Sequence, residues 1–133
     1  MSRIVLVEDE ATIRSVIEIL LSTEPDLELV GCASTAEEGI ELVRRLEPDL
    51  VLLDNQLEGA MTGTQAAPTM KGAAPRVVVL LCTALDLADI ASREPAIDGY
   101  LRKDNLVDLV DVVRRLLEGR AQAGSAERPS GSA

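Results

Sequence analysis

Acidic, hydroxyl and basic side chains stand at the ends of several short apolar runs in this sequence. Glu8 and Asp9 follow the first run, and Asp54 follows the third. Thr83 and Lys103 follow two later runs. Hard divalent cations such as Mg²⁺ take oxygen ligands and keep several waters, so two or three carboxylates can hold one. A hydroxyl and an ammonium group beside them would stabilise the oxygens of a phosphoryl group. These residue types indicate a site for a divalent cation and a phosphoryl group.

A carboxylate at such a site can also attack phosphorus itself and form an acyl phosphate. Crowded carboxylates repel one another, so Glu8, Asp9 and Asp54 require a bound cation or Lys103 beside them. Each residue also has a simpler interpretation: Asp54 as the cap of a turn, and Thr83 as an ordinary strand residue. The acidic pair also suits the first turn of a helix, where the helix dipole stabilises negative charge. The interpretation as a site depends on the whole set.

The elements that must position these residues alternate between strand and helix. Apolar runs predict strands at 3–7, 27–33, 49–53, 76–82 and 99–102. Helical periodicity and capping signals predict helices between them: from Ile13 to Leu21, from a capping box at Ser34–Glu37 to before Pro48, over 86–93, and from Leu106 to a cap at Gly119. Residues 55–75 carry three glycines and Pro68, so we expect only a short or broken helix near 64–70.

Five alternations of strand and helix predict an α/β fold, a doubly wound parallel sheet with helices on both faces. Right-handed crossovers favour the flavodoxin-like strand order 2-1-3-4-5. In that order the first and third strands are neighbours at the switch point, where ligands bind at the carboxyl ends of the strands. Asp9 and Asp54 are therefore expected to face the same crevice.

Length and composition restrict the class of protein. A chain of 133 residues with 47% hydrophobic residues is one globular domain, which we place at residues 1–119, with 120–133 as a disordered tail or linker. The net charge of −10 argues against direct binding of nucleic acid. No apolar stretch is long enough for a membrane span, and no signal segment precedes the first strand, so the cytoplasm is the expected location.

The remaining residues of chemical interest narrow the possibilities further. The chain has no histidine, which excludes a histidine triad, a histidine metal ligand and a phosphohistidine carrier in this chain. Cys32 and Cys82 lie in apolar runs without CxxC spacing, so both are expected to be buried structural thiols rather than zinc ligands. Tyr100 is the only aromatic residue of the chain, which indicates a role beyond filling space in the core.

Four segments together resemble the receiver domains of bacterial two-component response regulators. They occur in the order of that family and at its usual spacing, over roughly residues 1–119, and they are Ile4–Glu10, Pro48–Asp54, Val79–Ala84 and Gly99–Asp104. The resemblance implies a signalling switch rather than an enzyme, although one that assists its own phosphorylation and dephosphorylation. Its implied partners are a sensor histidine kinase or phosphotransfer protein, and a downstream protein target or an output domain absent from this chain. A homodimer is also compatible with the family.

The resemblance also implies a role for each site residue. Asp54 would accept a phosphoryl group from the phosphohistidine of a partner kinase. Asp9 would bind Mg²⁺ directly and Glu8 through water, together with Asp54 and the main-chain carbonyl of Gln56. Thr83, Tyr100 and Lys103 would have switch and phosphoryl-stabilising roles. The Thr83 hydroxyl would move toward the phosphoryl group, and the Tyr100 ring would turn inward. Lys103 would form an ion pair with the phosphoryl group.

The sequence departs from the family pattern in the loop after Asp54. Receivers usually carry proline at the position of Glu58 and Met-Asp-Gly where this chain has Met61-Thr62-Gly63, and Ala60 reads as an insertion. The path of this loop and the mode of output are therefore open. Two other functions stay open beside the switch: a pseudo-receiver that binds partners without phosphorylation, and a small Mg²⁺-dependent phosphatase or phosphotransferase. Such enzymes typically have an acid where this chain has Gln56, which disfavours turnover.

Overall fold

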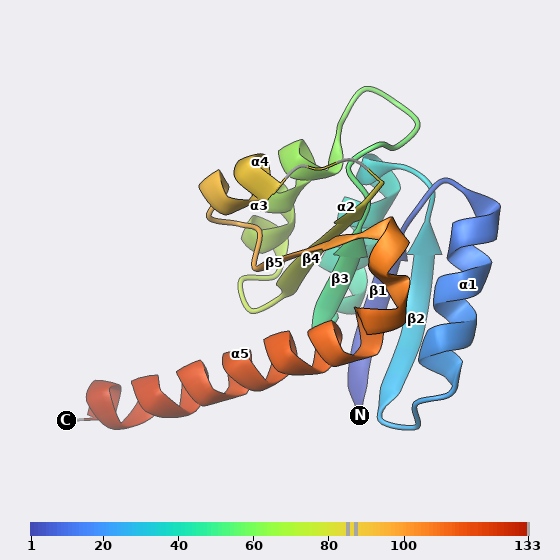
Figure 1. Cartoon of the computed structure of the whole chain (residues 1–133). Helices are drawn as coiled ribbons and strands as arrows, with labels where there is room; N and C mark the ends of the chain where they lie inside the picture. Colours follow the sequence, from blue (N-terminus) through green and yellow to red (C-terminus); the bar gives the residue numbers. More distant parts are fainter. Residues whose placement is uncertain (85, 87, 133) are drawn as a thin grey trace.

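Five parallel strands form one sheet in the computed structural model of this protein (Figure 1). The structure describes the backbone of residues 1–84, 86 and 88–132, and side chains in this range up to Arg120. The strands are β1 (Ser2–Val7), β2 (Leu27–Ala33), β3 (Leu50–Leu53), β4 (Val78–Thr83) and β5 (Gly99–Arg102). Their order is β2-β1-β3-β4-β5, and every neighbouring pair is parallel. The predicted fold and strand order are confirmed.

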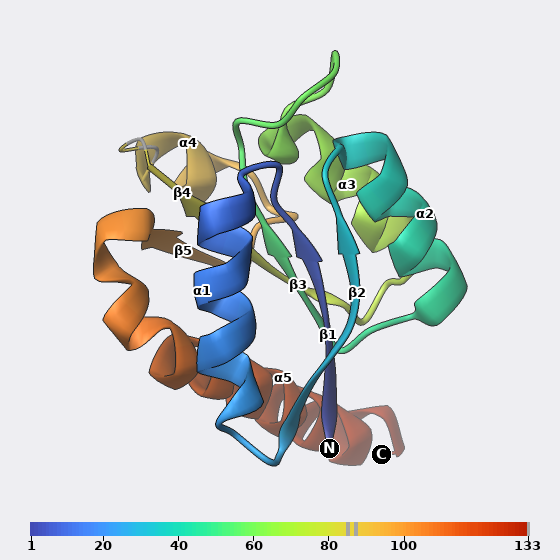
Figure 2. The ribbon, with the colours of Figure 1, turned by 90° about the vertical axis from the view of Figure 1, so that its right-hand side faces the viewer.

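Helices cover both faces of this sheet (Figures 1 and 2). One face carries α2 (Ala36–Leu46), α3 (Gly63–Ala73) and α4 (Ala88–Arg93), and the other carries α1 (Ala11–Ser22) and α5 (Leu109–Ser132), which follows a 3₁₀ helix, η1 (Lys103–Asp108). Side chains of β1 alternate between the two layers, because Val5 and Val7 pack under α2 while Ile4 and Leu6 pack toward α1. All four residues of β3 are fully buried, as a central parallel strand requires.

Helix α3 is longer and more regular than the sequence predicts. It runs without a break through Pro68, over 11 residues. A capping box fixes its start: the Thr62 hydroxyl accepts from Gln65 N at 3.2 Å, and Gln65 Oε1 accepts from Thr62 N at 2.9 Å. Pro68 lies on the exposed side, where water can satisfy the carbonyl that its missing N–H leaves free. The cap on α2 is likewise one residue later than predicted, at Thr35 rather than Ser34.

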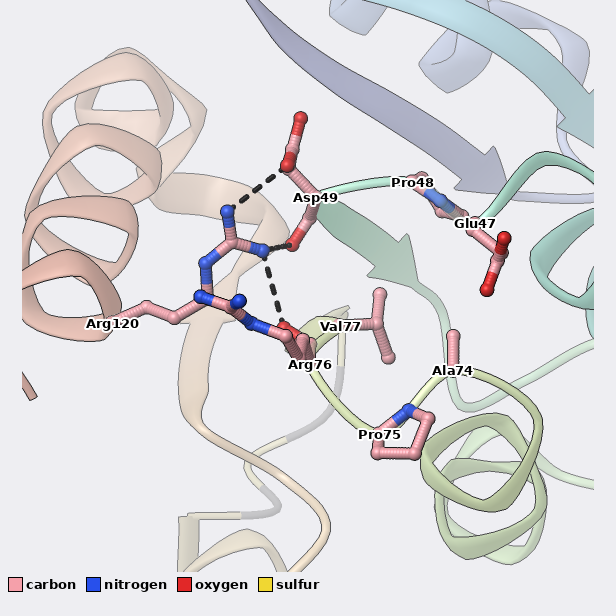
Figure 3. Close-up of a pocket in the computed structure, with 8 residues that line it drawn as sticks. All are labelled: Glu47, Pro48, Asp49, Ala74, Pro75, Arg76, Val77 and Arg120. Carbon is pink, nitrogen blue, oxygen red and sulfur yellow. Dashed lines mark hydrogen bonds and ion pairs between the residues drawn. The ribbon is translucent and has the colours of Figure 1, made fainter. Parts of the chain in front are cut away.

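Helix α5 continues past Gly119, where the sequence predicts its end. Arg120 fastens this part of the helix to the amino-terminal edge of the sheet (Figure 3). Its guanidinium donates to the Asp49 carbonyl at 3.1 Å, to Asp49 Oδ1 at 3.0 Å and to the Arg76 carbonyl at 3.1 Å. These contacts close one side of a pocket of about 570 Å³. The pocket lies at the opposite edge from the strand ends that carry Glu8 and Asp54.

The two cysteines differ in their environment. Cys82 is buried in β4, as predicted, and burial raises the pKa of its thiol to about 12. The prediction is wrong for Cys32, which is exposed. Cys32 lies on β2, an edge strand of the sheet, with its sulfur 3.7 Å from Glu18 Oε1 of α1. In the described part of the chain, no helix has the length and apolar character needed to cross a membrane.

Candidate functional site

Three carboxylates meet at the carboxyl ends of β1 and β3. Glu8 and Asp9 directly follow β1, and Asp54 directly follows β3. The strands place them together because β1 and β3 are paired, with Val7 opposite Leu53. One oxygen from each of Glu8, Asp9 and Asp54 lies within 4.8 Å of the other two. Glu8 and Asp54 are buried, while Asp9 is partly accessible. The structure therefore brings together the three carboxylates that the sequence analysis singled out.

Lys103 brings positive charge to the cluster from the end of β5. Its ammonium nitrogen lies 2.7 Å from Glu8 Oε1 and 2.9 Å from Asp54 Oδ2. The side chains of Glu8 and Asp54 are each 3% exposed, and that of Lys103 is 12% exposed. A buried carboxylate without a partner is costly, and Lys103 offsets part of the negative charge of Glu8 and Asp54. Lys103 thus binds two of the three carboxylates that the sequence predicted it to accompany.

Burial and pairing act in opposite directions on these ionisable groups. Burial is the largest influence on Glu8 and raises the pKa of its carboxyl, against the hydrogen bonds from Lys103 and Glu10 N. Burial of Lys103 works to lower its pKa, but the hydrogen bonds to Glu8 and Asp54 outweigh it and raise the pKa. Lys103 therefore stays charged beside Glu8 and Asp54.

Two further predicted residues lie on the neighbouring strands β4 and β5. Thr83 ends β4 and is fully buried. Among the residues that the structure describes, none hydrogen-bonds to its hydroxyl. Tyr100 lies in β5 opposite Leu81, half-buried against the α2–α4 layer. A buried hydroxyl without a partner is rare, because its desolvation is uncompensated, so the state of Thr83 requires an explanation.

The segment after Asp54 contributes main-chain groups. Gln56 N donates to Asp54 Oδ1 at 3.3 Å, and the Gln56 side chain is exposed. Sequence reasoning missed the importance of Gly63, which it noted only as part of the altered Met-Thr-Gly segment. A Cβ atom at Gly63 would lie 2.1 Å from the Asp54 carbonyl oxygen, so only glycine fits there. The signal in the sequence that could have indicated this close approach was a glycine at the start of a helix, next to a predicted site.

The donor set suits a hard divalent cation. Carboxylate oxygens are the preferred ligands of Mg²⁺, which keeps part of its water shell. Glu8, Asp9 and Asp54 offer three such oxygens, of which that of Asp9 is the most accessible. The single ammonium of Lys103 pairs with both Glu8 and Asp54 and cannot balance two carboxylates, and of the three acids Asp9 has no ion pair among the described residues.

The fold is shared with known receiver domains. The chain resembles a two-component response regulator of the LuxR family from Aurantimonas sp. SI85-9A1, with a TM-score of 0.82, 27% identity, and coverage of 96% of this chain and 98% of that one. The receiver domain of the putative response regulator NarL from Mycobacterium tuberculosis gives a TM-score of 0.80 and 28% identity, over 89% and 97% of the chains.

Curated relatives agree with the structures. The nitrate/nitrite response regulator protein NarL of Escherichia coli K12 is 33% identical over 129 residues, which are 95% of this chain and 59% of that protein. The response regulator protein VraR of Staphylococcus aureus Mu3 is 30% identical over 122 residues, covering 90% and 58%. The chain thus spans less than two thirds of the length of either relative.

This protein has a doubly wound sheet with three carboxylates, a hydroxyl and a lysine at the carboxyl ends of its strands. Such an arrangement is typical of signalling domains that respond to phosphorylation. A family model described as the response regulator receiver domain matches residues 4–114. The chain belongs to this family, whose members are phosphorylation-activated switches that bind Mg²⁺ in an acidic pocket and interact with histidine kinases and output domains.

Proposed function

We propose that Asp54 is the phosphoryl acceptor of this receiver domain. One carboxylate oxygen of Asp54 attacks phosphorus of a kinase phosphohistidine, the P–N bond breaks, and its electron pair leaves with the imidazole nitrogen. The product is an aspartyl phosphate. The observation that carries this proposal is the buried Asp54 carboxylate, held 2.9 Å from Lys103 and beside Glu8 and Asp9.

The neighbouring residues divide the remaining work. Asp9 and Asp54 would hold Mg²⁺, with Glu8 acting through water and the Gln56 carbonyl completing the protein's share. The bound ion supplies positive charge that stabilises the phosphoryl oxygens. Lys103 would exchange its contact with Asp54 for one with the phosphoryl group. Its remaining contact with Glu8, at 2.7 Å, keeps the ammonium at the site during that exchange.

The switch would begin at Thr83. Its buried hydroxyl has no hydrogen-bond partner among the described residues, and a phosphoryl oxygen at Asp54 would supply one. Movement of Thr83 toward Asp54 would free space beside β5 and allow the ring of Tyr100 to turn inward. The changed surface over α4 and β5 would then carry the signal, in protein contacts, in a homodimer or to an output domain of a longer regulator.

We propose that this domain acts in the cytoplasm as a switch, without direct binding of nucleic acid and without enzymatic turnover. A net charge of −10 opposes direct binding of nucleic acid by this domain. Gln56 stands where an aspartyl-phosphate phosphatase typically carries an acid, so we propose a switch that assists its own phosphorylation and dephosphorylation rather than an enzyme of multiple turnover. The curated relatives are longer response regulators, which supports an output domain as the partner.

Intact mass measurement tests the proposal. Wild-type protein incubated with Mg²⁺ and acetyl phosphate should gain the mass of one phosphoryl group, and Asp54→Asn should gain none. Asp26→Asn is the matched control, because Asp26 pairs with Arg114 far from the site and should be modified like the wild type. A wild type that gains no phosphoryl group would favour the pseudo-receiver, and rapid turnover of a phosphomonoester would favour the phosphatase.

A further inference from the structure

Asn55, the residue after the proposed acceptor, is bound to the start of α3. Its carbonyl accepts from Gly63 N at 3.1 Å, and its Oδ1 accepts from Thr64 N at 2.9 Å and from the Thr64 hydroxyl at 2.6 Å. Gly63 and Thr64 are the first two residues of the helix, whose N–H groups have no partner inside it. Asn55 therefore caps α3 from outside the helix, in addition to the capping box at Thr62.

The main chain of Asp54 is held from two sides. On one side, Asp54 N donates to the Val7 carbonyl of β1 at 3.0 Å. On the other side, the first turn of α3 lies against the Asp54 carbonyl, as shown by the 2.1 Å separation that a Cβ atom at Gly63 would have from that oxygen. The acceptor has little freedom to shift as long as Asn55 keeps α3 in place.

The loop between these contacts extends away from the sheet (Figures 1 and 2). Seven residues, Gln56 to Thr62, leave from Asn55 and return to Gly63. Glu58 forms an isolated bridge with Thr35 at the start of α2, and Gly59 turns the chain with a φ of +99°. Because both ends of this loop meet at Asn55, its altered sequence and length need not displace Asp54.

We propose that Asn55 and Thr64 act as positioning residues, forming a clasp that fixes Asp54 and the following Gln56 peptide for phosphoryl acceptance and Mg²⁺ binding. This inference rests on the proposed function of Asp54. A clasp acts through geometry, and small displacements of a reacting group cost large factors in rate. The clasp also separates the site from the variable part of the loop.

Two isosteric substitutions test the clasp, and each removes a different side-chain hydrogen bond at the start of α3. Thr64→Val removes the 2.6 Å hydrogen bond to Asn55 Oδ1. The matched control Thr62→Val removes the 3.2 Å hydrogen bond to Gln65 N, which caps α3 without touching Asn55. Both should lower the melting temperature, because both weaken the start of α3. Only Thr64→Val should also slow phosphorylation by acetyl phosphate, by about tenfold, and weaken Mg²⁺ binding.

Two further variants complete the experiment: one that restores the hydroxyl at position 64, and one that changes the length of the loop. Thr64→Ser keeps the hydroxyl and should phosphorylate within about twofold of the wild type. Deletion of Ala60 at the exposed part of the loop should likewise leave rate and Mg²⁺ affinity within twofold. Equal rates and equal Mg²⁺ affinities for Thr64→Val and Thr62→Val would overturn the clasp while the function of Asp54 stands. If the wild type gains no phosphoryl group, the proposed function fails, and Mg²⁺ affinity alone decides for or against the clasp.

Discussion

At the scale of single residues, Thr83 combines a stability cost with a proposed switching role. Its fully buried hydroxyl lacks a hydrogen-bond partner among the described residues. Replacement by an apolar group of the same shape removes that cost. We predict that Thr83→Val raises the free energy of unfolding of the unphosphorylated protein by about 1 kcal/mol, measured by urea denaturation. A loss of stability in this variant would show that the hydroxyl is satisfied.

The same substitution should remove the response to phosphorylation. Tyr100 is the only aromatic residue of the chain, so intrinsic fluorescence reports on this ring alone. Phosphorylation of the wild type should change that fluorescence, and phosphorylation of Thr83→Val should not. Thr83→Ser is the control, because it keeps the hydroxyl and should keep the response, although it loses a buried methyl group and with it some stability.

At the scale of elements, the sequence predicted most of what strand periodicity and capping determine. The bounds of β2 and β5 are those predicted, because turn residues and apolar runs delimit them. Helix α3 was missed in part because Pro68 weakens a local prediction, whereas the contact with Asn55 and the local capping box at Thr62 stabilise the helix. The burial of Cys32 was misjudged because its apolar run was taken as a sign of burial, although the predicted strand order already places this strand at an edge of the sheet, where side chains are more open to solvent. Ion pairs between distant segments outside the candidate site also escaped prediction, because no local pattern in the sequence shows which charged residues meet.

Arg120 and Asp49 form one such contact, between α5 and the start of β3. Asp49 Oδ2 accepts from Arg3 N at 2.7 Å, and Oδ1 accepts from Arg120 at 3.0 Å. Burial of Asp49 acts to raise its pKa, but these hydrogen bonds outweigh it and hold the pKa below its ordinary value of 3.8. A lowered pKa contributes stability above the unfolded value, and that stability disappears as the pH falls through the folded value.

We therefore predict a pH-dependent effect of Asp49→Asn. At pH 7 the variant should lose about 1.5 kcal/mol of unfolding free energy, because two hydrogen bonds to a charged group are weakened. Urea denaturation at pH values below 3.8 should show a smaller difference from the wild type. Asp89→Asn is the control, because Asp89 is 92% exposed and its pairing with Arg93 should matter at neither pH. A constant deficit at both pH values would contradict the assignment.

At the scale of the whole molecule, the acidic surface affects every measurement of cation binding. With a net charge of −10, added NaCl screens repulsion and stabilises the fold. Specific binding of Mg²⁺ adds to this effect, by about 2.7 kcal/mol when the free ion is at 100 times its dissociation constant. The two contributions are separated by comparing MgCl₂ with NaCl at equal ionic strength.

The site then predicts which residue carries the specific contribution. Asp9 lies within 4.8 Å of the carboxylates of Glu8 and Asp54, and Lys103 pairs with those two acids but not, in the described structure, with Asp9. Asp9→Asn should therefore abolish most of the stabilisation that MgCl₂ gives beyond NaCl, measured by thermal denaturation. Glu10→Gln removes the same charge one residue further on, at an exposed position outside the cluster, and should retain the full Mg²⁺ effect. Equal responses of the two variants would mean that Mg²⁺ acts on the acidic surface as a whole, and not at Asp9.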